Sequence, residues 1–231
     1  MQSQDYLVIS PVKPSKTAKI AGAAVFGALA WFLAVPEFFK IPFYPLTYLT
    51  FDFAEIPVMF SFLVFGPAAG IISSVVLWGT LNFVGSTGTF GATMKFIAVA
   101  SAALGLWIGV SLYSKVSSKI ALKGALASGF IFSLLLRVAI MTVANYVALT
   151  IVFPDFMGFA VDMLAKANIV DAAAPFSGIV AILLITGVYN TMHTALSLIP
   201  SYFLSTIPSS STALKMGRPW ITSIQAKKQN P

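Results

Sequence analysis

Charged residues are scarce in this sequence. Of its 231 residues only 9% are Asp, Glu, Lys or Arg, whereas 58% are hydrophobic. A soluble domain carries roughly 25% charged residues, so too few charges are present here to cover a surface in contact with water. No polar stretch is long enough to form an additional soluble domain. The composition therefore predicts an integral membrane protein.

Cysteine is absent, and histidine occurs once, as His193. The lack of cysteine excludes disulfides, thiolate metal sites and a cysteine nucleophile. A single histidine with scattered carboxylates has no metal-ligand spacing, so we expect neither a metal site nor catalytic residues. An intramembrane hydrolase would need Ser86 or Ser177 beside His193, and Ser86 falls in a predicted external loop near a different helix. The sequence also lacks the ATP-binding pattern G-x-x-x-x-G-K-[ST].

The stretch 50–82 predicts a membrane hairpin. Asp52 and Glu55 open it, an apolar run follows, and a second apolar run begins at the Gly66-Pro67 break. Two apolar segments joined by so tight a break must be antiparallel neighbours. The first is short for a span, which normally needs ~20 residues, so we expect its carboxylate end to lie in a recess rather than in lipid.

Apolar runs predict an all-α bundle of six membrane helices, at about 17–35, 52–65, 67–84, 92–113, 121–153 and 176–204. The segments 36–50 and 154–175 are expected to be loops, the first because its prolines and aromatic residues cannot hold a long helix. Residues 1–15 and 206–231 are predicted to be tails on either side of a membrane domain at 16–205.

Basic residues predict the orientation of these helices. Ten of the 14 Lys and Arg residues fall in the two tails and the loop between the fourth and fifth helices: Lys13, Lys16, Lys19, Lys115, Lys119, Lys123, Lys215, Arg218, Lys227 and Lys228. The opposite loops hold Lys40 and Lys166. Because Lys and Arg are enriched on the cytoplasmic face, both termini are expected in the cytoplasm and the carboxylate end of the hairpin outside. This clustering explains the basic excess better than nucleic-acid binding does.

Ionisable residues within membrane segments are costly and are therefore candidates for function. Five fall within or next to the predicted helices: Asp52, Glu55, Lys95, Arg137 and His193. Asp52 and Glu55 are three residues apart, which fits either an N-terminal cap with a reciprocating glutamate or a ligand site at the start of the helix. Arg137 is predicted to be a buried partner of Asp52 or Glu55. Lys95 is predicted to reach the outer membrane interface.

Asn145, Asn190 and His193 form a second group of candidates. Asn190 and His193 are three residues apart and therefore share one helical face. Their polar side chains either pack between helices or line a pocket whose amides hydrogen-bond a polar heterocycle. Tyr48 and Phe51 are among the aromatic residues available to stack on such a ring.

Small residues line one face of the first predicted helix, with Ala24 and Ala28 four residues apart. This spacing lets another helix approach closely, either within the bundle or from a separate protein. The same apolar run resembles a signal peptide with a cleavage site at 28–30. Because five more apolar segments follow, an uncleaved first helix is the preferred interpretation.

Four segments resemble one transporter family in their order and spacing. DFAEIPVMFSFLVFGPAAG resembles its Asp-x-x-x-Ile-Pro start and Gly-Pro turn, and GSTGTFG resembles its glycine-rich loop before the fourth helix. NYVALTIVFP resembles the end of its fifth helix, and VYNTMHTALS its sixth-helix segment, where an asparagine is followed three residues on by a lysine. The family is that of the membrane-embedded S components of energy-coupling factor (ECF) vitamin transporters, and the similarity is to the riboflavin-specific type.

This resemblance implies roles for individual residues. Asn145 and Asn190 fall on positions that hydrogen-bond the flavin ring. His193 stands where the riboflavin type usually has the lysine, so a fixed positive charge is replaced by a ring that donates or accepts a hydrogen bond. Ala24 and Ala28 resemble the small-residue motif that docks on the T component. The expected substrate-binding set is Asn145, Asn190, His193, Asp52, Tyr48 and Phe51.

The implied function is binding and transport without chemistry. An S component captures its vitamin from outside, in a recess closed by the loop between its first two helices, and docks on a membrane T component coupled to two ATPase subunits. The expected ligand is riboflavin or a related flavin, as cargo and not as a cofactor, and the expected location is the cell membrane, with several spans. The alternatives are the same fold with another vitamin or heterocycle, and a channel or structural membrane bundle.

Overall fold

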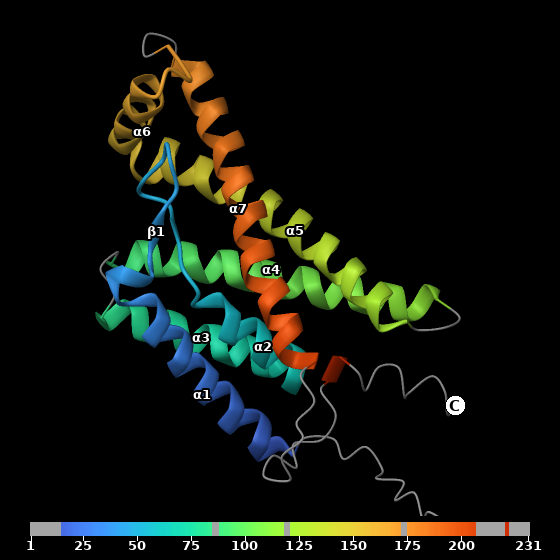
Figure 1. Ribbon diagram of the computed structural model, residues 1–231. Helices are drawn as coiled ribbons and strands as arrows, with labels where there is room; N and C mark the ends of the chain where they lie inside the picture. The colour runs from blue at the N-terminus through green and yellow to red at the C-terminus, as the bar shows by residue number, and fades with distance from the viewer. Residues whose placement is uncertain (1–14, 85–87, 118–120, 172–174, 207–219, 222–231) are drawn as a thin grey trace, which may run out of the picture.

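The computed structural model describes residues 15–84, 88–117, 121–171, 175–206 and 220–221 (Figure 1). Its elements are α1 (Lys16–Ala34), the 3-10 helix η1 (Glu37–Phe39), the strands β1 (Ile41–Pro42) and β2 (Thr50–Phe51), α2 (Glu55–Phe65), α3 (Pro67–Val84), α4 (Gly88–Val116), α5 (Leu122–Val147) continued by the π-helical η2 (Ala148–Val152), α6 (Pro154–Lys166) and α7 (Pro175–Thr206). The two strands are antiparallel, with Ile41 opposite Phe51. The described structure is therefore almost entirely helical.

Four of the described helices are long and apolar enough to cross a membrane: Lys16–Ala34, Gly88–Val116, Leu122–Val152 and Ser177–Ser205. The apolar helices Glu55–Phe65 and Pro67–Phe83 are shorter. At 1.5 Å per residue, the 11 residues of α2 extend about 17 Å, roughly half of a ~30 Å hydrocarbon core. All six predicted apolar segments thus form helices, and the number of complete spans stays a prediction.

The helix α6 contradicts the prediction of a loop over 154–175. Pro154 occupies its first turn, where a missing N–H costs no hydrogen bond. Asp155 in the first turn and Lys166 in the last complement the helix dipole. Its buried face, formed by Ala160, Val161 and Leu164, packs with Leu46 and Ile182. The proline and charges that suggested a loop therefore lie at the two ends of a short helix.

Small residues on α1 divide between two faces. Ala23, Gly27, Ala30 and Ala34 are buried, and a side chain at Gly27 would place its Cβ 2.7 Å from Cβ of Val76 on α3. Ala24 and Ala28 lie on the exposed side of the same helix. The predicted alanine face is therefore two surfaces, one packed within the bundle and one open to its surroundings.

The turn between α2 and α3 depends on Gly66. Its φ of +100° lies in a region that L side chains rarely adopt. A Cβ at Gly66 would also lie 3.1 Å from the ring of Trp220, which meets Phe62 edge-on at 5.4 Å. Ile221 next to it is buried in the main core. The C-terminal pair 220–221 thus packs against the α2–α3 hairpin.

The helices α4 and α5 pack closely through small residues. A Cβ added at Gly105 would lie 2.4 Å from the Phe132 carbonyl oxygen. A Cβ added at Gly109 would lie 2.4 Å from the Ser128 carbonyl oxygen. Ser133 Oγ donates to the Ala102 carbonyl oxygen at 2.9 Å. Because the two backbones are in contact, they hold Lys95 of α4 and Arg137 of α5 in a fixed relation.

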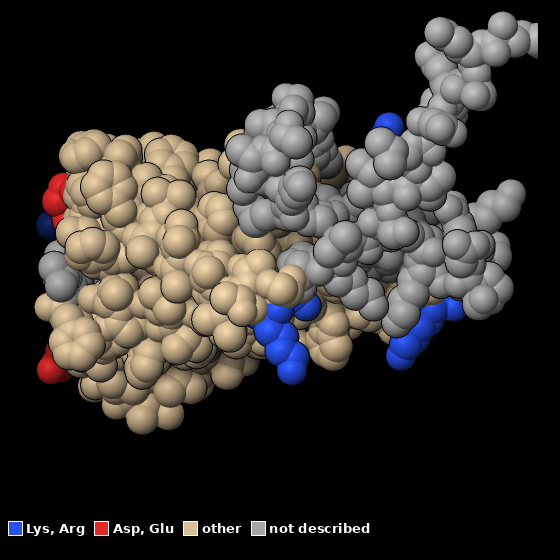
Figure 2. Space-filling model, turned by 90° about the horizontal axis from the view of Figure 1, so that it is seen from below, with Lys and Arg blue, Asp and Glu red and all other residues tan. Residues whose placement is uncertain are grey.

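In Figure 2 the acidic side chains lie at one end of the molecule, and most basic side chains lie from its middle toward the other end, with an uncharged surface between the two groups. The helix α6 and the β1–β2 loop lie together near the start of α7, away from the start of α1 (Figure 1). Among the described residues, Lys16, Lys115 and Lys123 are exposed at helix ends remote from α6, and Asp155 and Asp162 are exposed on α6.

Candidate functional site

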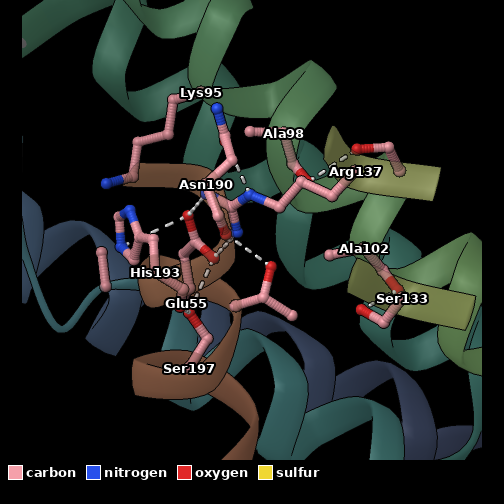
Figure 3. A network of polar contacts seen from close by, with 12 residues as sticks. Glu55, Lys95, Ala98, Ala102, Ser133, Arg137, Asn190, His193 and Ser197 are labelled. Carbon is pink, nitrogen blue, oxygen red and sulfur yellow. Dashed lines mark hydrogen bonds and ion pairs between the residues drawn. The ribbon is translucent and has the colours of Figure 1, made fainter. Parts of the chain in front are cut away.

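A buried ion pair joins α2 to α5 in the interior of the bundle (Figure 3). Arg137 Nη1 donates to Glu55 Oε2 at 2.5 Å, and Nη2 donates to Oε1 at 2.9 Å. Both residues are 1% exposed. A bidentate arginine–carboxylate pair is the geometry that best compensates the cost of removing two charges from water. Of the two carboxylates predicted as partners of Arg137, it is Glu55 that the arginine contacts.

Two residues of α7 complete the hydrogen bonds of this pair. Arg137 Nε donates to Asn190 Oδ1 at 3.0 Å, and Asn190 Nδ2 donates to the Thr186 carbonyl oxygen at 2.9 Å. Ser197 Oγ lies 2.8 Å from Glu55 Oε2. The interior charges are therefore tied to three helices, α2, α5 and α7. Ser197 was not predicted, although its position four residues after His193 places it on the same helical face.

Asp52 belongs to a different ion pair and does not cap α2. The helix begins at Glu55, and its N-cap residue, Ala54, has no side chain that could cap it. Asp52 Oδ1 instead accepts a hydrogen bond from Ala54 N at 3.0 Å, and its other oxygen pairs with Lys95 of α4. The reciprocal cap, one of the two interpretations of this pair, is therefore wrong, because Glu55 is directed at Arg137. Lys95 pairs with a carboxylate of the loop before α2, and its place at the outer membrane interface stays a prediction.

His193 and Tyr189 attach the segment before α2 to α7. Tyr189 Oη donates to the Thr50 carbonyl oxygen at 2.6 Å. His193 Nδ1 lies 3.1 Å from Tyr189 Oη, and Nε2 lies 3.3 Å from the Asp52 carbonyl oxygen and 3.5 Å from Glu55 Oε1. The imidazole thus lies between the loop and the buried ion pair, in contact with both.

Aromatic rings from the loop and from α7 pack around His193. Phe51 stacks on Tyr189, with ring centroids 4.9 Å apart and an interplanar angle of 29°. Phe51 also meets His193 edge-on at 5.6 Å, and Phe43 contacts both Phe51 and Tyr189 at 5.5 Å. Flat rings and hydrogen-bonding side chains are therefore adjacent, as a site for a heteroaromatic ligand requires.

Tyr48 lies further out, between the loop and α6. Its ring meets Phe156 edge-on at 5.0 Å. Burial of the phenol in this apolar contact raises the pKa of Tyr48 to about 12. Tyr48 therefore contributes to the packing of α6 over the site and stays protonated at neutral pH.

Asn145 is separate from the other two members of its predicted group. Its Nδ2 donates to the Met141 carbonyl oxygen of its own helix at 2.7 Å. It lies eight residues beyond Arg137 on α5, about 12 Å along the axis and turned by about 80° around it. The structure thus brings Asn190 and His193 together around Glu55 and places Asn145 further along α5, with its Oδ1 receiving no hydrogen bond from the described residues.

The described residues contain no group of three or more His, Asp and Glu side chains placed to hold a metal ion. Ser177, one of the serines considered for a hydrolase, lies sixteen residues before His193 on α7, about 24 Å away along the helix axis. Ser86 falls outside the described residues. The arrangement of Ser177 and His193 does not fit nucleophilic catalysis, which needs the two side chains in hydrogen-bond contact.

Comparison with known proteins places this chain in a family. No family model matches the sequence. The riboflavin transporter RibU of Staphylococcus aureus (strain TCH60) is 30% identical over 156 residues, which cover 67% of this chain and 77% of that protein. The chain belongs to the S components of ECF transporters. A solved structure described as the S component of a bacterial ECF transporter matches this S component with a TM-score of 0.60 and 21% identity, over 82% of this chain and 94% of the other.

Membership in this family establishes the chain as a multi-pass membrane protein of a transport system. Its relatives are transporter subunits and not enzymes. The buried ion pair, the loop before α2 and the aromatic rings on α7 are therefore interpreted as parts of a binding subunit.

Proposed function

We propose that this S component captures riboflavin, or a related flavin, from outside the cell for ATP-driven uptake. The observation that carries the proposal is the 30% identity to a riboflavin transporter across two thirds of the chain. The proposed substrate-binding residues are Asn145, Asn190, His193, Asp52, Tyr48 and Phe51. All of them lie on the loop before α2, the outer part of α5 or α7.

The chemistry of these residues suits a flavin. The isoalloxazine ring is flat, and its edge carries carbonyl oxygens and ring nitrogens. Tyr189 and His193 offer aromatic surfaces in the slot that Phe51 also lines, and Asn145 offers a carbonyl oxygen that receives no hydrogen bond from the described part of the chain. Asn190 keeps one lone pair on Oδ1 and one N–H beyond its bonds to Arg137 and Thr186. A flavin can therefore be recognised by stacking and amide hydrogen bonds without a fixed charge at position 193.

The orientation we propose has six spans, a membrane domain at 16–205 and cytoplasmic tails at 1–15 and 206–231. It rests on the ten basic residues of the tails and the α4–α5 loop. The loop before α2 and α6 then face outward, so the site opens to the side from which a vitamin arrives.

The partners we propose are a membrane T component and two ATPase subunits. The exposed face of α1 supports a docking site, because Ala24 and Ala28 present small side chains at four-residue spacing on the outside of the bundle. The other face of α1 is already packed against α3.

The test is a fluorescence titration of the purified chain with riboflavin, using thiamine and biotin as controls. The four tryptophans provide the signal. We expect saturable quenching by riboflavin alone, and a weaker response after Asn145→Ala. Saturable binding of thiamine or biotin without binding of riboflavin would reject the proposal that the ligand is a flavin. Ion conductance by the isolated chain would instead indicate a channel.

A further inference from the structure

The backbone on both sides of Phe51 is fixed to the bundle. Tyr189 Oη holds the Thr50 carbonyl oxygen, and His193 Nε2 lies 3.3 Å from the Asp52 carbonyl oxygen. The Asp52 side chain is paired with Lys95 on α4. None of these contacts involves the Phe51 ring itself. The ring can therefore leave its position while the segment stays attached to α4 and α7.

Phe51 fills an aromatic slot formed by α7 and the loop. Its ring stacks on Tyr189, meets the ring of His193 edge-on, and packs beside Phe43. Among the ring contacts of the described residues, Phe51 on Tyr189 is the one with nearly parallel planes. Offset stacking of this kind is what a flat heteroaromatic ligand makes with an aromatic wall.

We propose that Phe51 is a placeholder: it occupies the stacking position on Tyr189 in the empty protein, and the ring of the incoming vitamin displaces it. The inference rests on the proposed function, because it takes the ligand to be a flat heteroaromatic ring. The placeholder keeps an apolar slot from filling with water before the ligand arrives. It also sets the substrate class, because a ligand without a flat ring cannot replace the contacts that Phe51 gives up.

The exchange has a quantitative consequence for affinity. If Phe51 occupies the slot for about nine-tenths of the time, only the remaining tenth of the molecules is ready to bind, and the apparent affinity is lowered about tenfold. Removing the Phe51 ring should therefore tighten binding and speed association. A residue that stacks on the bound ligand would behave in the opposite way, since its removal weakens binding.

The experiment compares Phe51→Ala with Phe53→Ala in the full chain. Phe53 lies two residues further on in the same segment, makes none of the ring contacts described for Phe51 and is not part of the proposed site. Stopped-flow fluorescence with riboflavin should give about tenfold tighter binding for Phe51→Ala, mainly through faster association. Phe53→Ala should bind as the unsubstituted chain does. Equal or weaker binding by Phe51→Ala would overturn the proposal.

A second measurement needs no ligand and separates this inference from the proposed function. Hydroxyl-radical footprinting, read by mass spectrometry, reports how accessible the Tyr189 ring is in the empty protein. We expect oxidation of Tyr189 to rise several-fold in Phe51→Ala and to stay unchanged in Phe53→Ala. Unchanged oxidation in Phe51→Ala would overturn the placeholder even if riboflavin binds. If the unsubstituted chain does not bind riboflavin but Tyr189 oxidation increases in Phe51→Ala, riboflavin is rejected as the ligand. The position of Phe51 over Tyr189 is then still supported.

Discussion

Arg137 and Glu55 carry opposite charges in the interior of the bundle, and each is 1% exposed. Every polar atom of the pair has a partner: the guanidinium contacts Glu55 and Asn190, and the carboxylate also contacts Ser197. Such a pair gives little net stability compared with apolar residues of the same size, but removal of one member leaves an uncompensated buried charge. The pair is therefore best tested one residue at a time and then together.

We expect Arg137→Met to lower the stability of the fold by about 3–5 kcal/mol, because Glu55 would be left ionised without its partner. The double variant Arg137→Met with Glu55→Met should recover most of this loss, since neither charge then remains. Thermal unfolding in detergent measures both. A double variant that is less stable than Arg137→Met would show that the two residues act independently.

Sequence reasoning could identify this pair only in part. An arginine in the middle of an apolar helix needs a carboxylate, and the sequence offers two near the start of α2. Which of them it meets depends on the rotation of α2 against α5, which no local pattern encodes. The pairing of Lys95 with Asp52, 43 residues apart, could not be predicted for the same reason. The separation of Asn145 from Asn190 likewise follows from the packing of α5 against α7.

At the scale of the elements, α1 presents two surfaces with different chemistry. Gly27 faces α3, where added atoms meet Val76. Ala28 is its neighbour in sequence and points away from the bundle. One face therefore belongs to the fold and the other is free for a partner, so substitutions on the two faces should have different effects.

We expect Ala28→Trp to leave vitamin binding and thermal stability unchanged and to abolish uptake in cells that contain the T component and ATPases. The indole would block close approach of a partner helix. The control is Gly27→Leu, which should lower stability by about 1–3 kcal/mol through overpacking. If Ala28→Trp transported vitamin at the normal rate, this face of α1 would be excluded as the docking site.

The apolar segments could be predicted from the sequence because a membrane demands long hydrophobic runs with satisfied backbone groups. The helix α6 could not be predicted in the same way. It is short, its ends carry Pro154, Asp155 and Lys166, and it is helical because Leu164 and its neighbours pack against Leu46. Its sequence signals are a proline at the start, an acidic first turn, a basic last turn and an apolar face at helical spacing, none of which the average hydropathy of the segment shows.

At the scale of the whole molecule, the charges divide into two kinds. The charged side chains at the helix ends are exposed, and their distribution is consistent with the proposed orientation. The charged side chains in the interior pair with one another. Among the residues that the structure describes, the interior set consists of two carboxylates, Asp52 and Glu55, and two cations, Lys95 and Arg137. They sum to zero.

This balance determines how the protein responds to a voltage across the membrane. Moving one elementary charge through 100 mV involves about 2.3 kcal/mol. A rearrangement that carries the interior set across the membrane, while the charges at the helix ends stay on their own sides, moves no net charge. Riboflavin itself is uncharged at neutral pH. We therefore expect uptake into proteoliposomes containing the complete transporter to be independent of a potassium-diffusion potential.

Lys95→Gln should introduce a dependence on that potential, because Asp52 would then carry an uncompensated negative charge, and Lys95→Arg should not. Voltage-dependent uptake by the unsubstituted protein would contradict the balance. With the balance intact, the membrane potential does no electrical work on a movement of the interior set, and ATP is the expected source of energy for uptake in energised and de-energised cells alike.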